Sequence, residues 1–557
     1  MIEETLTRVL AEAVSGVAEE FGLVGDLPRI ELSKPKLKEH GDFSTNAALA
    51  LASRVGRAPR EVAQAVVDHL PGADLIERAE VAGPGFVNLF VTDSWLYAVL
   101  RDVVEQGDRY GWSEPADHAI QVEYVSANPT GPLHIGHARN AAIGDVIANV
   151  MQAAGWRVER EYYFNDAGHQ MDLFGASVEG RYLELFGRPG VIPEGGYPGE
   201  YLVDVAKDIA AVFGDSLVDL PEAERHARLL HEGAELMLAM IKDTLTRFGV
   251  GFDVFFSERT LHESGEIDEA VELLRRAGHA YEAEGAVFFR STRFGDDKDR
   301  VLIRSNGAPT YFAADCAYLV DKFRRGFDHL IYVWGADHHG DVVRVKGAAK
   351  ALGYDPDAVE MILYQWVSLY RGGEAVGMSK RAGTFVTLDE LLDEVGTDAT
   401  RFTLLSRSND SSLDFDIEAA KRQSMDNPVY YVQYAHARLV SILRHAAERG
   451  VALWPVEEAD LSLLSAEAEL DLLRVIAETP EEVRQAADLR APHRLTRHAQ
   501  DLSVRVHRFY TDCRVVSEDD ALTQARLWLC TSAKQAIANV LALLGVSAPR
   551  SMERVDA

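Results

Sequence analysis

Two histidines three residues apart are the first side chains whose type and spacing could do chemistry. His134 and His137 lie in the sequence PLHIGH, together with Gly136. At the start of a helix, residues three apart share a face, so both imidazole rings could donate hydrogen bonds to phosphate oxygens. The helix N-terminus adds a partial positive charge, and a glycine lets the backbone approach a ligand closely. This pattern predicts a nucleotide site, and two surface histidines beside a turn are the alternative.

A lysine about 240 residues downstream could serve the same nucleotide. Lys380 follows Met378 and Ser379 in the sequence GMSKRAGTF. Its ammonium group is a flexible point charge, which suits the charge that develops on a leaving pyrophosphate. Such a cation is compatible with the nucleotide site that the histidines predict.

Acidic and aromatic residues between these two motifs could hold a cationic ligand. A guanidinium group needs carboxylates and an aromatic face. Tyr311 and Asp315 are four residues apart in YFAADCAYL and share a face if this segment is helical. Glu258 is a further candidate, and Glu123 and Asn128 flank the end of a predicted strand. Each of these residues alone could equally be an ordinary surface residue, so this chemistry does not by itself select arginine.

A protein-bound metal is the remaining chemical possibility, because Asp337, His338 and His339 are consecutive. Adjacent residues on a strand point to opposite faces, so the two histidines could not readily bind one ion. The three cysteines of the chain are scattered, without a C-x-x-C pair. This spacing argues against a cysteine zinc site and a disulfide framework. We therefore expect no dedicated metal site.

The segments that must position the histidines are typical of a βαβ unit. Residues 119–125 (AIQVEYV) have the pattern of a strand, and a loop rich in proline and glycine follows. Residues 138–154 then carry apolar side chains on one helical face, and residues 156–164 predict a second strand. Such a unit implies a parallel sheet with its ligand site at the carboxyl ends of the strands.

The flanking segments suggest further domains. Helical patterns over residues 1–20 and 46–53 precede strand patterns within residues 80–91, as in a small α+β domain. Residues 165–285 are mostly helical and predict an insertion into the catalytic domain.

Strand patterns then return and could complete the sheet. They lie at residues 287–290, 301–304 and 329–334. Beyond residue 400 the chain is predicted to be almost entirely helical. Prolines expected at helix starts or ends are Pro428, Pro480, Pro492 and Pro549.

Composition limits the partners and the compartment. At roughly 100–200 residues per domain, 557 residues suggest three to five domains. The formal net charge is −31, so any RNA binding must use local basic patches on an acidic body. The N-terminus lacks the basic start and apolar core of a signal peptide, and no run of about 18 apolar residues occurs. We expect a cytoplasmic enzyme without a membrane segment.

The two motifs resemble the signature sequences of the class I aminoacyl-tRNA synthetases. The sequence HIGH between a strand and a helix is similar to the first signature, and GMSKR resembles the second, Lys-Met-Ser-Lys-Ser. Gly377 and Arg381 depart from that second pattern. Over essentially its whole length the sequence is similar to the arginyl-tRNA synthetase family. The segments that carry this similarity are EYVSANPTGPLHIGHARNAAIGD, YFAAD, WGADHHGD, KPKLKEHGDFSTNAALALA, GPGFVNLFV and DNPVYYVQYAHARLVSIL.

The resemblance implies a role for individual residues. Catalysis is expected of His134, Gly136, His137 and Lys380. Contacts to ATP are expected of His134, His137, Asp337, Met378, Ser379 and Lys380. Contacts to arginine are expected of Glu123, Ser126, Asn128, Glu258, Tyr311 and Asp315. Contacts to tRNA are expected of Lys34, Lys36, Lys38, Tyr431 and Tyr434, with a solvated lysine loop and core tyrosines as the alternatives.

The resemblance also implies an architecture and an activity. It implies a multidomain α/β plus α protein: an α+β domain for the tRNA elbow (1–115), a Rossmann-like catalytic domain (116–385), a connector (386–425) and an all-α anticodon-binding bundle (426–557). The implied reaction activates L-arginine with ATP, which brings its Mg²⁺, and transfers the arginyl group to the 3′-terminal adenosine of tRNA(Arg). A monomer is expected. The alternatives are another class I synthetase, an H-x-G-H adenylyltransferase and a non-catalytic tRNA-binding paralogue.

Overall fold

The computed structural model describes residues 2–23, 25–35, 37–71, 75–166, 168–376 and 386–552. The chain divides into two compact units. One unit consists of Met1–Gly107, Ile442–Ala477 and His507–Ala533. The other consists of Asp108–Ser441, Glu478–Val506 and Lys534–Ala557.

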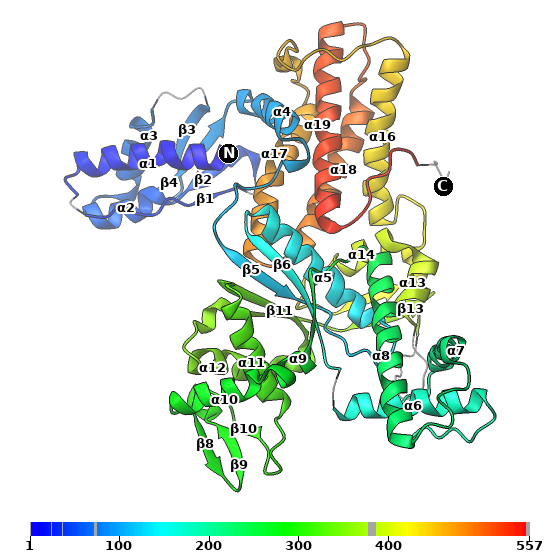
Figure 1. Cartoon of the computed structure of the whole chain (residues 1–557). Coiled ribbons are helices and arrows are strands. Elements are labelled where there is room, and N and C mark those ends of the chain that lie inside the picture. Colours follow the sequence, from blue (N-terminus) through cyan, green and yellow to red (C-terminus); the bar gives the residue numbers. More distant parts are fainter. Residues whose placement is uncertain are drawn as a thin grey trace. The chain divides into compact units, whose positions relative to one another are not determined.

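The N-terminal part of the first unit is an antiparallel sheet packed against helices (Figure 1). Its strands, in the spatial order β1-β2-β4-β3, are β1 (Leu32–Ser33), β2 (Phe43–Thr45), β3 (Ile76–Ala82) and β4 (Phe86–Val91). Its helices are α1 (Ile2–Glu20), α2 (Ala47–Val55), α3 (Pro59–Asp68) and α4 (Ser94–Gln106). Leu10, Leu51 and Leu89 are fully buried between the two layers. The predicted α+β character of this segment is therefore confirmed.

The second unit is built on a parallel sheet of five strands in the order β12-β11-β5-β6-β7. These strands are β5 (Ala119–Glu123), β6 (Arg157–Phe164), β7 (Val254–Ser257), β11 (His329–Gly335) and β12 (Val359–Tyr364). The helix α5 (Ile135–Ala153) connects β5 to β6, as the βαβ pattern predicted. All five residues of β5 are buried, as expected of a central parallel strand covered on both faces. Gly144 lets α5 pack closely here, because a side chain at this position would collide with the Tyr124 ring.

The helical insertion ends earlier than predicted. Its helices are α6 (His169–Leu185), α7 (Tyr201–Phe213) and α8 (Glu222–Arg247), which share a separate core around Phe174 and Met237. The strand β7 follows them inside the predicted 165–285 range and pairs with β6 of the main sheet. Its four residues, VFFS, are too short a run to distinguish from a helical segment by periodicity.

Two of the predicted strands do not extend the parallel sheet. β8 (Ala280–Ala283), β9 (Ala286–Phe289) and β10 (Arg300–Ile303) form a separate antiparallel sheet. Glu284 and Gly285 connect β8 to β9 with φ of 52° and 74°, the positive values that a tight hairpin turn requires. The strand predicted at 287–290 is therefore β9, which pairs with its sequence neighbour β8. Only the strand predicted at 329–334 joins the main sheet, as β11. Helices around these strands are α9 (Glu258–Ser264), α10 (Glu266–Arg276), α11 (Tyr311–Arg324) and α12 (His339–Ala351).

The remainder of the chain is mainly helical, with one small sheet. β13 (Val367–Arg371), β14 (Glu374–Ala375) and β15 (Leu413–Asp416) form that sheet. The helices are α13 (Leu388–Val395), α14 (Thr397–Leu404), α15 (Ile417–Ala420), α16 (Pro428–Glu448), α17 (Glu467–Asp488), α18 (His493–Asp512) and α19 (Asp520–Leu544).

One of the predicted helix boundaries is wrong. Pro428 begins α16 and Pro492 directly precedes α18, but Pro480 lies inside α17. The neighbouring Thr479 and Val483 are buried, so tertiary packing holds the helix together on both sides of the proline. Of the described helices, α19 alone is long and apolar enough to cross a membrane, and 72% of its apolar window is buried, as in the core helix of a globular protein.

Candidate active site

The two histidines form the start of α5 at the carboxyl end of β5. His134 is the N-cap of the helix, and its Nδ1 accepts a hydrogen bond from the Gly136 N–H at 3.1 Å. The Nδ1 of His137 accepts one from the His134 N–H at 3.3 Å, and the two rings stack with centroids 3.8 Å apart. Because both Nδ1 atoms act as acceptors, both neutral rings carry their N–H on the Nε2 atom.

Two further residues of α5 hold this helix start against the sheet. Asn140 accepts from the Val125 N–H at 2.6 Å and donates to the Val333 carbonyl at 2.8 Å, so it links the ends of β5 and β11. Arg139 is fully buried and donates to the carbonyls of Gln365 at 2.7 Å and of residues 408 and 411 at 3.1 and 2.9 Å. Burial lowers the pKa of the Arg139 guanidinium. No sequence motif pointed to these two residues.

The turn after β5 has an unusual backbone. Val125 and Ser126 have φ of 65° and 43°, values that are rare for residues other than glycine and unfavourable for a β-branched side chain. The turn directs the Ser126 hydroxyl back to Glu123, to whose Oε1 it donates at 3.0 Å, while it accepts from the Tyr163 N–H at 3.2 Å. Such strained residues concentrate at functional sites. The turn brings two of the predicted arginine contacts, Glu123 and Ser126, together.

A group of carboxylates lies at the carboxyl ends of β5, β6 and β7. Glu258 is 4% exposed and accepts from the Tyr163 hydroxyl at 2.7 Å. Asp315 is accessible to solvent but surrounded by protein, and burial, Glu258 and Glu123 together raise the pKa of its carboxyl to about 7. Burial and the same acids also raise the pKa of Tyr163. The three carboxylates predicted from the sequence are therefore close enough to influence one another's charge.

Two cations support these acids, and neither was predicted. Lys322 donates to Glu123 Oε2 at 2.6 Å, and Arg325 donates twice to Glu161 Oε2, both times at 2.7 Å. Tyr318 also donates to Glu161. Tyr318 and Lys322 belong to α11 and Arg325 is its C-cap, so the segment around Asp315 is helical and Tyr311 and Asp315 share a face.

Tyr311 begins the helix that carries Asp315, and Asn128 lies in the loop after β5. Tyr311 is 55% exposed at the first turn of α11, which Thr310 caps by accepting from the Ala313 N–H. Asn128 donates to Gln170 at 2.9 Å and accepts from the Asn165 N–H at 3.2 Å. The Tyr311 ring is therefore exposed to solvent, whereas the Asn128 amide is held by contacts within the protein.

The segment that carries Asp337 is a helical turn, not the strand assumed when a metal site was considered. Asp337 lies in a short 3₁₀ helix, and α12 begins at His339. The neighbouring His338 contacts Asp341 at 3.1 Å. Among the described residues, no group of three or more histidine, cysteine, aspartate or glutamate side chains is placed to hold a metal ion.

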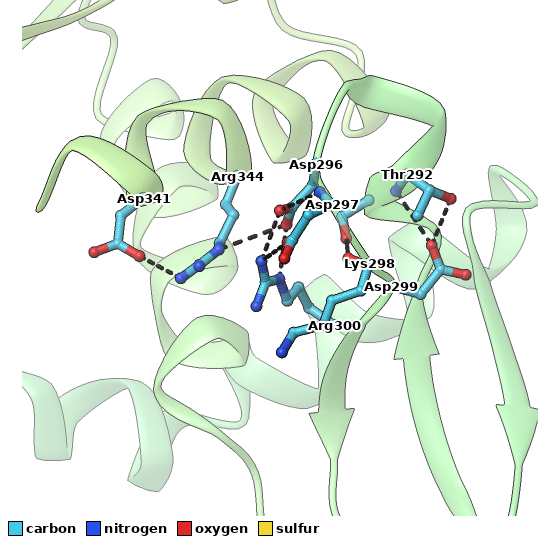
Figure 2. Close-up of polar contacts among 9 residues, drawn as sticks. Thr292, Asp296, Asp297, Lys298, Asp299, Arg300, Asp341 and Arg344 are labelled. Atoms are coloured by element: carbon cyan, nitrogen blue, oxygen red, sulfur yellow. Dashed lines mark hydrogen bonds and ion pairs between the residues drawn. The ribbon is translucent and has the colours of Figure 1, made fainter.

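Figure 2 shows how α12 is fixed to the loop between β9 and β10. Arg344 lies between Asp341, with which it forms an ion pair, and Asp296, whose Oδ2 is 3.5 Å from its Nε. Arg300 donates to Asp296 at 2.7 and 2.6 Å, and this guanidinium lowers the pKa of the Asp296 carboxyl. The network holds the turn with Asp337 at the end of β11.

The second motif lies outside the described residues, including Gly377, Met378, Ser379, Lys380 and Arg381. The described chain resumes at Val386 beside the histidines. Thr387 pairs with His134, and the Leu388 N–H donates to the Leu133 carbonyl at 2.7 Å. The segment after the second motif therefore lies next to the first motif.

The predicted RNA contacts are only partly described. Lys34 is exposed and lies 4.0 Å from Glu3, whereas Lys36 and the side chain of Lys38 lie outside the described part of the chain. Tyr431 and Tyr434 are half-buried. Tyr434 stacks with Tyr430, four residues away, at a ring distance of 6.2 Å.

Fold and site together define a class of protein. The five-stranded parallel sheet places an H-x-G-H helix start and a group of acids at the carboxyl ends of its strands. A model of the class I (R) tRNA synthetase catalytic domain matches residues 99–425. The fold is shared with methionyl-tRNA synthetase from Mycobacterium tuberculosis, which is 14% identical with a TM-score of 0.52 over 77% of this chain and 91% of that chain. The chain is a class I aminoacyl-tRNA synthetase.

The flanking domains and the relatives identify the family. Models of the arginyl-tRNA synthetase N-terminal domain and of the DALR anticodon binding domain match residues 2–91 and 432–552. The chain belongs to the arginyl-tRNA synthetase family. It is 50% identical over 552 residues, 99% of each chain, to the arginine–tRNA ligase of Carboxydothermus hydrogenoformans, and 49% identical over 562 residues to that of Moorella thermoacetica, covering 99% of this chain and 100% of the relative. The arginyl-tRNA synthetase of Thermus thermophilus is 25% identical, with a TM-score of 0.76 over 98% of this chain and 100% of that chain. The resemblance in the sequence is confirmed, and the adenylyltransferase and paralogue alternatives are set aside.

Proposed function

We propose that this arginine–tRNA ligase holds the guanidinium of arginine between Asp315, Glu258 and the ring of Tyr311. The observation that carries the proposal is the meeting of three carboxylates at the carboxyl ends of the parallel strands, beside the histidine pair. Gathering like charges is costly unless a cation offsets them. A planar guanidinium can donate to two carboxylates and stack on an aromatic ring. Because Lys322 is already paired with Glu123, arginine would supply a cation for Asp315 and Glu258.

The other end of the substrate is assigned to the turn after β5. Glu123 carries the negative charge that an α-ammonium group needs, and Ser126 and Asn128 add polar atoms near it. In this orientation the carboxylate of arginine is directed toward the start of α5. The amino end of that helix and the Nε2–H groups of His134 and His137 provide a partly positive, hydrogen-bonding surface.

ATP is assigned to the same end of the sheet. His134 and His137 would donate to its phosphate oxygens, and Gly136, whose N–H is bonded to His134, keeps the approach to the backbone free of a side chain. Asp337 is assigned to the adenylate side, and ATP enters with Mg²⁺ as part of the substrate. The segment with Met378, Ser379 and Lys380 would contact the phosphates, with Lys380 stabilising the pyrophosphate as it leaves.

The reaction then has two displacements. A carboxylate oxygen of arginine attacks the α-phosphorus of ATP, the bond to the β-phosphate oxygen breaks, and pyrophosphate leaves. A ribose hydroxyl of the terminal tRNA adenosine next attacks the arginyl carbonyl carbon, and AMP leaves. In both steps the protein contributes chiefly position and fixed charge.

The remaining assignments concern the whole molecule. We assign residues 1–115 to the tRNA elbow through Lys34, Lys36 and Lys38. Residues 116–385 form the catalytic part, 386–425 the connector, and 426–557 the anticodon-binding part with Tyr431 and Tyr434. We also propose that the enzyme is a cytoplasmic monomer.

Pyrophosphate exchange in the presence of tRNA tests the arginine site. Breaking one partner of a buried charge pair costs roughly 3–5 kcal/mol. Asp315 remains reachable by solvent, so we expect a smaller loss for Asp315→Asn, about a hundredfold in the KM for arginine, with an unchanged KM for ATP. Asp357→Asn, at an exposed position, is the matched control. An equal loss for both substrates would remove Asp315 from the arginine site.

A further inference from the structure

Lys322 is a buried cation behind the acidic group. Its side chain is 1% exposed, and its Nζ lies 2.6 Å from Glu123 Oε2. The ammonium also lies 4.2 Å from the ring centre of Tyr318 and 3.9 Å from that of Tyr332. Lysine is almost never fully buried unless it is paired. The ammonium here is therefore held in one place by a carboxylate and two aromatic faces.

Both oxygens of Glu123 are engaged by this arrangement. Oε2 accepts from Lys322, and Oε1 accepts from the Ser126 hydroxyl at 3.0 Å. An ionised carboxylate can accept at both oxygens, whereas a protonated one would have to turn a hydroxyl toward one of these donors. The two bonds therefore fix the orientation of a residue that is itself only 5% exposed.

The groups that face Glu123 make its charge costly without the lysine. Acids act on it from α11, α9 and β6, and phenol groups from α11, β6 and β11. These residues are Asp315, Glu258, Glu161, Tyr318, Tyr163 and Tyr332. Glu161 has its own cation in Arg325. Lys322 also lowers the pKa of Asp315, against the larger raising effects of burial and the other acids.

We infer that Lys322 is a positioning residue for arginine activation, which keeps Glu123 an oriented carboxylate at the arginine site. The inference rests on the proposed function, because it takes Glu123 to bind the ammonium end of the substrate. Lys322 itself lies behind the carboxylate and does not contact arginine. Its effect reaches the substrate chiefly through Glu123, because its electrostatic effect on Asp315 is smaller than those of burial and the neighbouring acids.

The first test is Lys322→Met, which keeps the length of the side chain and removes its charge. Without the ammonium, Glu123 Oε2 loses its donor and the buried carboxylate loses the cation that offsets its charge. We expect the KM for arginine at pH 7.5 to rise about a hundredfold, with the KM for ATP within about threefold of wild type. Lys350→Met, at an exposed position of α12, is the matched control.

A purely structural role for Lys322 gives a different result. It would raise the two KM values together, or lower kcat without a selective rise in the KM for arginine. Either result, or a folded Lys322→Met variant with a normal KM for arginine, would overturn the inference.

A double-mutant cycle with Glu123→Gln covers the case in which Lys322→Met does not fold. If the lysine acts chiefly through Glu123, adding Lys322→Met to Glu123→Gln changes the KM for arginine by less than about threefold. The double variant should also fold, because both members of the buried pair are then neutral. A further tenfold loss, or failure of the double variant to fold, would show that Lys322 acts on something else.

Asp315→Asn separates this inference from the proposed function. A selective arginine defect in Asp315→Asn with none in Lys322→Met would refute only the role of the lysine. The absence of a selective defect in Asp315→Asn would refute the arginine site itself.

Discussion

The protonation of Asp315 should make arginine binding depend on pH near neutrality. Burial raises the pKa of this carboxyl to about 7, with Glu258 and Glu123 adding to the effect. Only the ionised form attracts a guanidinium. Below pH 7 the unliganded site therefore holds a proton that arginine must displace, and above pH 8 the carboxylate is already free.

The size of the effect follows from one titrating group. With a pKa of about 7, roughly one site in eleven is ionised at pH 6 and roughly ten in eleven at pH 8. The dissociation constant for arginine should therefore be about tenfold higher at pH 6 than at pH 8. At pH 7 binding should release about half a proton per arginine.

Isothermal titration calorimetry of arginine binding measures both quantities. Titrations in two buffers of different ionisation enthalpy give the number of protons released, and repeating them from pH 6 to pH 8.5 gives the affinity profile. Asp315→Asn should bind weakly and without proton release in this range. A wild-type affinity that stays constant between pH 6 and pH 8, or proton uptake instead of release, would refute the reasoning.

Three further predictions follow from single contacts. A raised pKa in the folded state means that the stabilising contribution of the Asp315 carboxyl is lost as pH rises through about 7. Asp315→Asn should therefore raise the melting temperature at pH 8 and have less effect at pH 5.5 in scanning calorimetry without arginine, and a lower melting temperature at pH 8 would contradict this. Tyr163→Phe removes the hydroxyl that donates to Glu258 at 2.7 Å, so pyrophosphate exchange should show a KM for arginine raised about tenfold at nearly constant kcat. Arg139→Met leaves several buried carbonyls without their donor and should lower the free energy of unfolding in urea by about 3–5 kcal/mol, whereas a loss below about 1 kcal/mol would mean that water replaces the guanidinium.

Local patterns in the sequence predicted the parts of the fold that depend on neighbouring residues. The strand, loop, helix and strand around His134 follow from apolar periodicity and a glycine-rich loop, and the structure confirms them as β5, α5 and β6. The condition that Tyr311 and Asp315 share a face if their segment is helical is met by α11. In contrast, the short runs VFFS and AVFF have no periodicity of their own. Their place in the fold depends on the strand with which each one pairs. VFFS pairs with β6 in the parallel sheet, and AVFF pairs with β8 in a hairpin.

The supporting residues of the site could not be predicted from spacing. Lys322 and Glu123 are 199 positions apart, and Arg139 reaches carbonyls more than 200 positions away. A buried lysine on an otherwise apolar face of α11 was the one available signal, because such a residue requires a partner. The sequence alone does not say which carboxylate is that partner. The acids of the site were predicted from the family resemblance. The cations that offset their negative charge lie outside the motifs that were recognised in the sequence.

The balance of charge at the site bears on how the enzyme rejects lysine. Lysine matches arginine in net charge, but its ammonium is a single compact donor, whereas a guanidinium presents five N–H groups in a planar fork. In the proposed arginine site, Glu258 is 4% exposed and the pKa of Asp315 is raised to about 7, so the surroundings of both acids disfavour a negative charge. A ligand that donates hydrogen bonds to only one of these acids leaves the charge of the other uncompensated. A site built to hydrogen-bond a substrate rejects an analogue that leaves its buried polar groups unpaired by about 10⁴–10⁵. Selection at the binding step can therefore be severe enough that a separate hydrolytic site is not required for this amino acid.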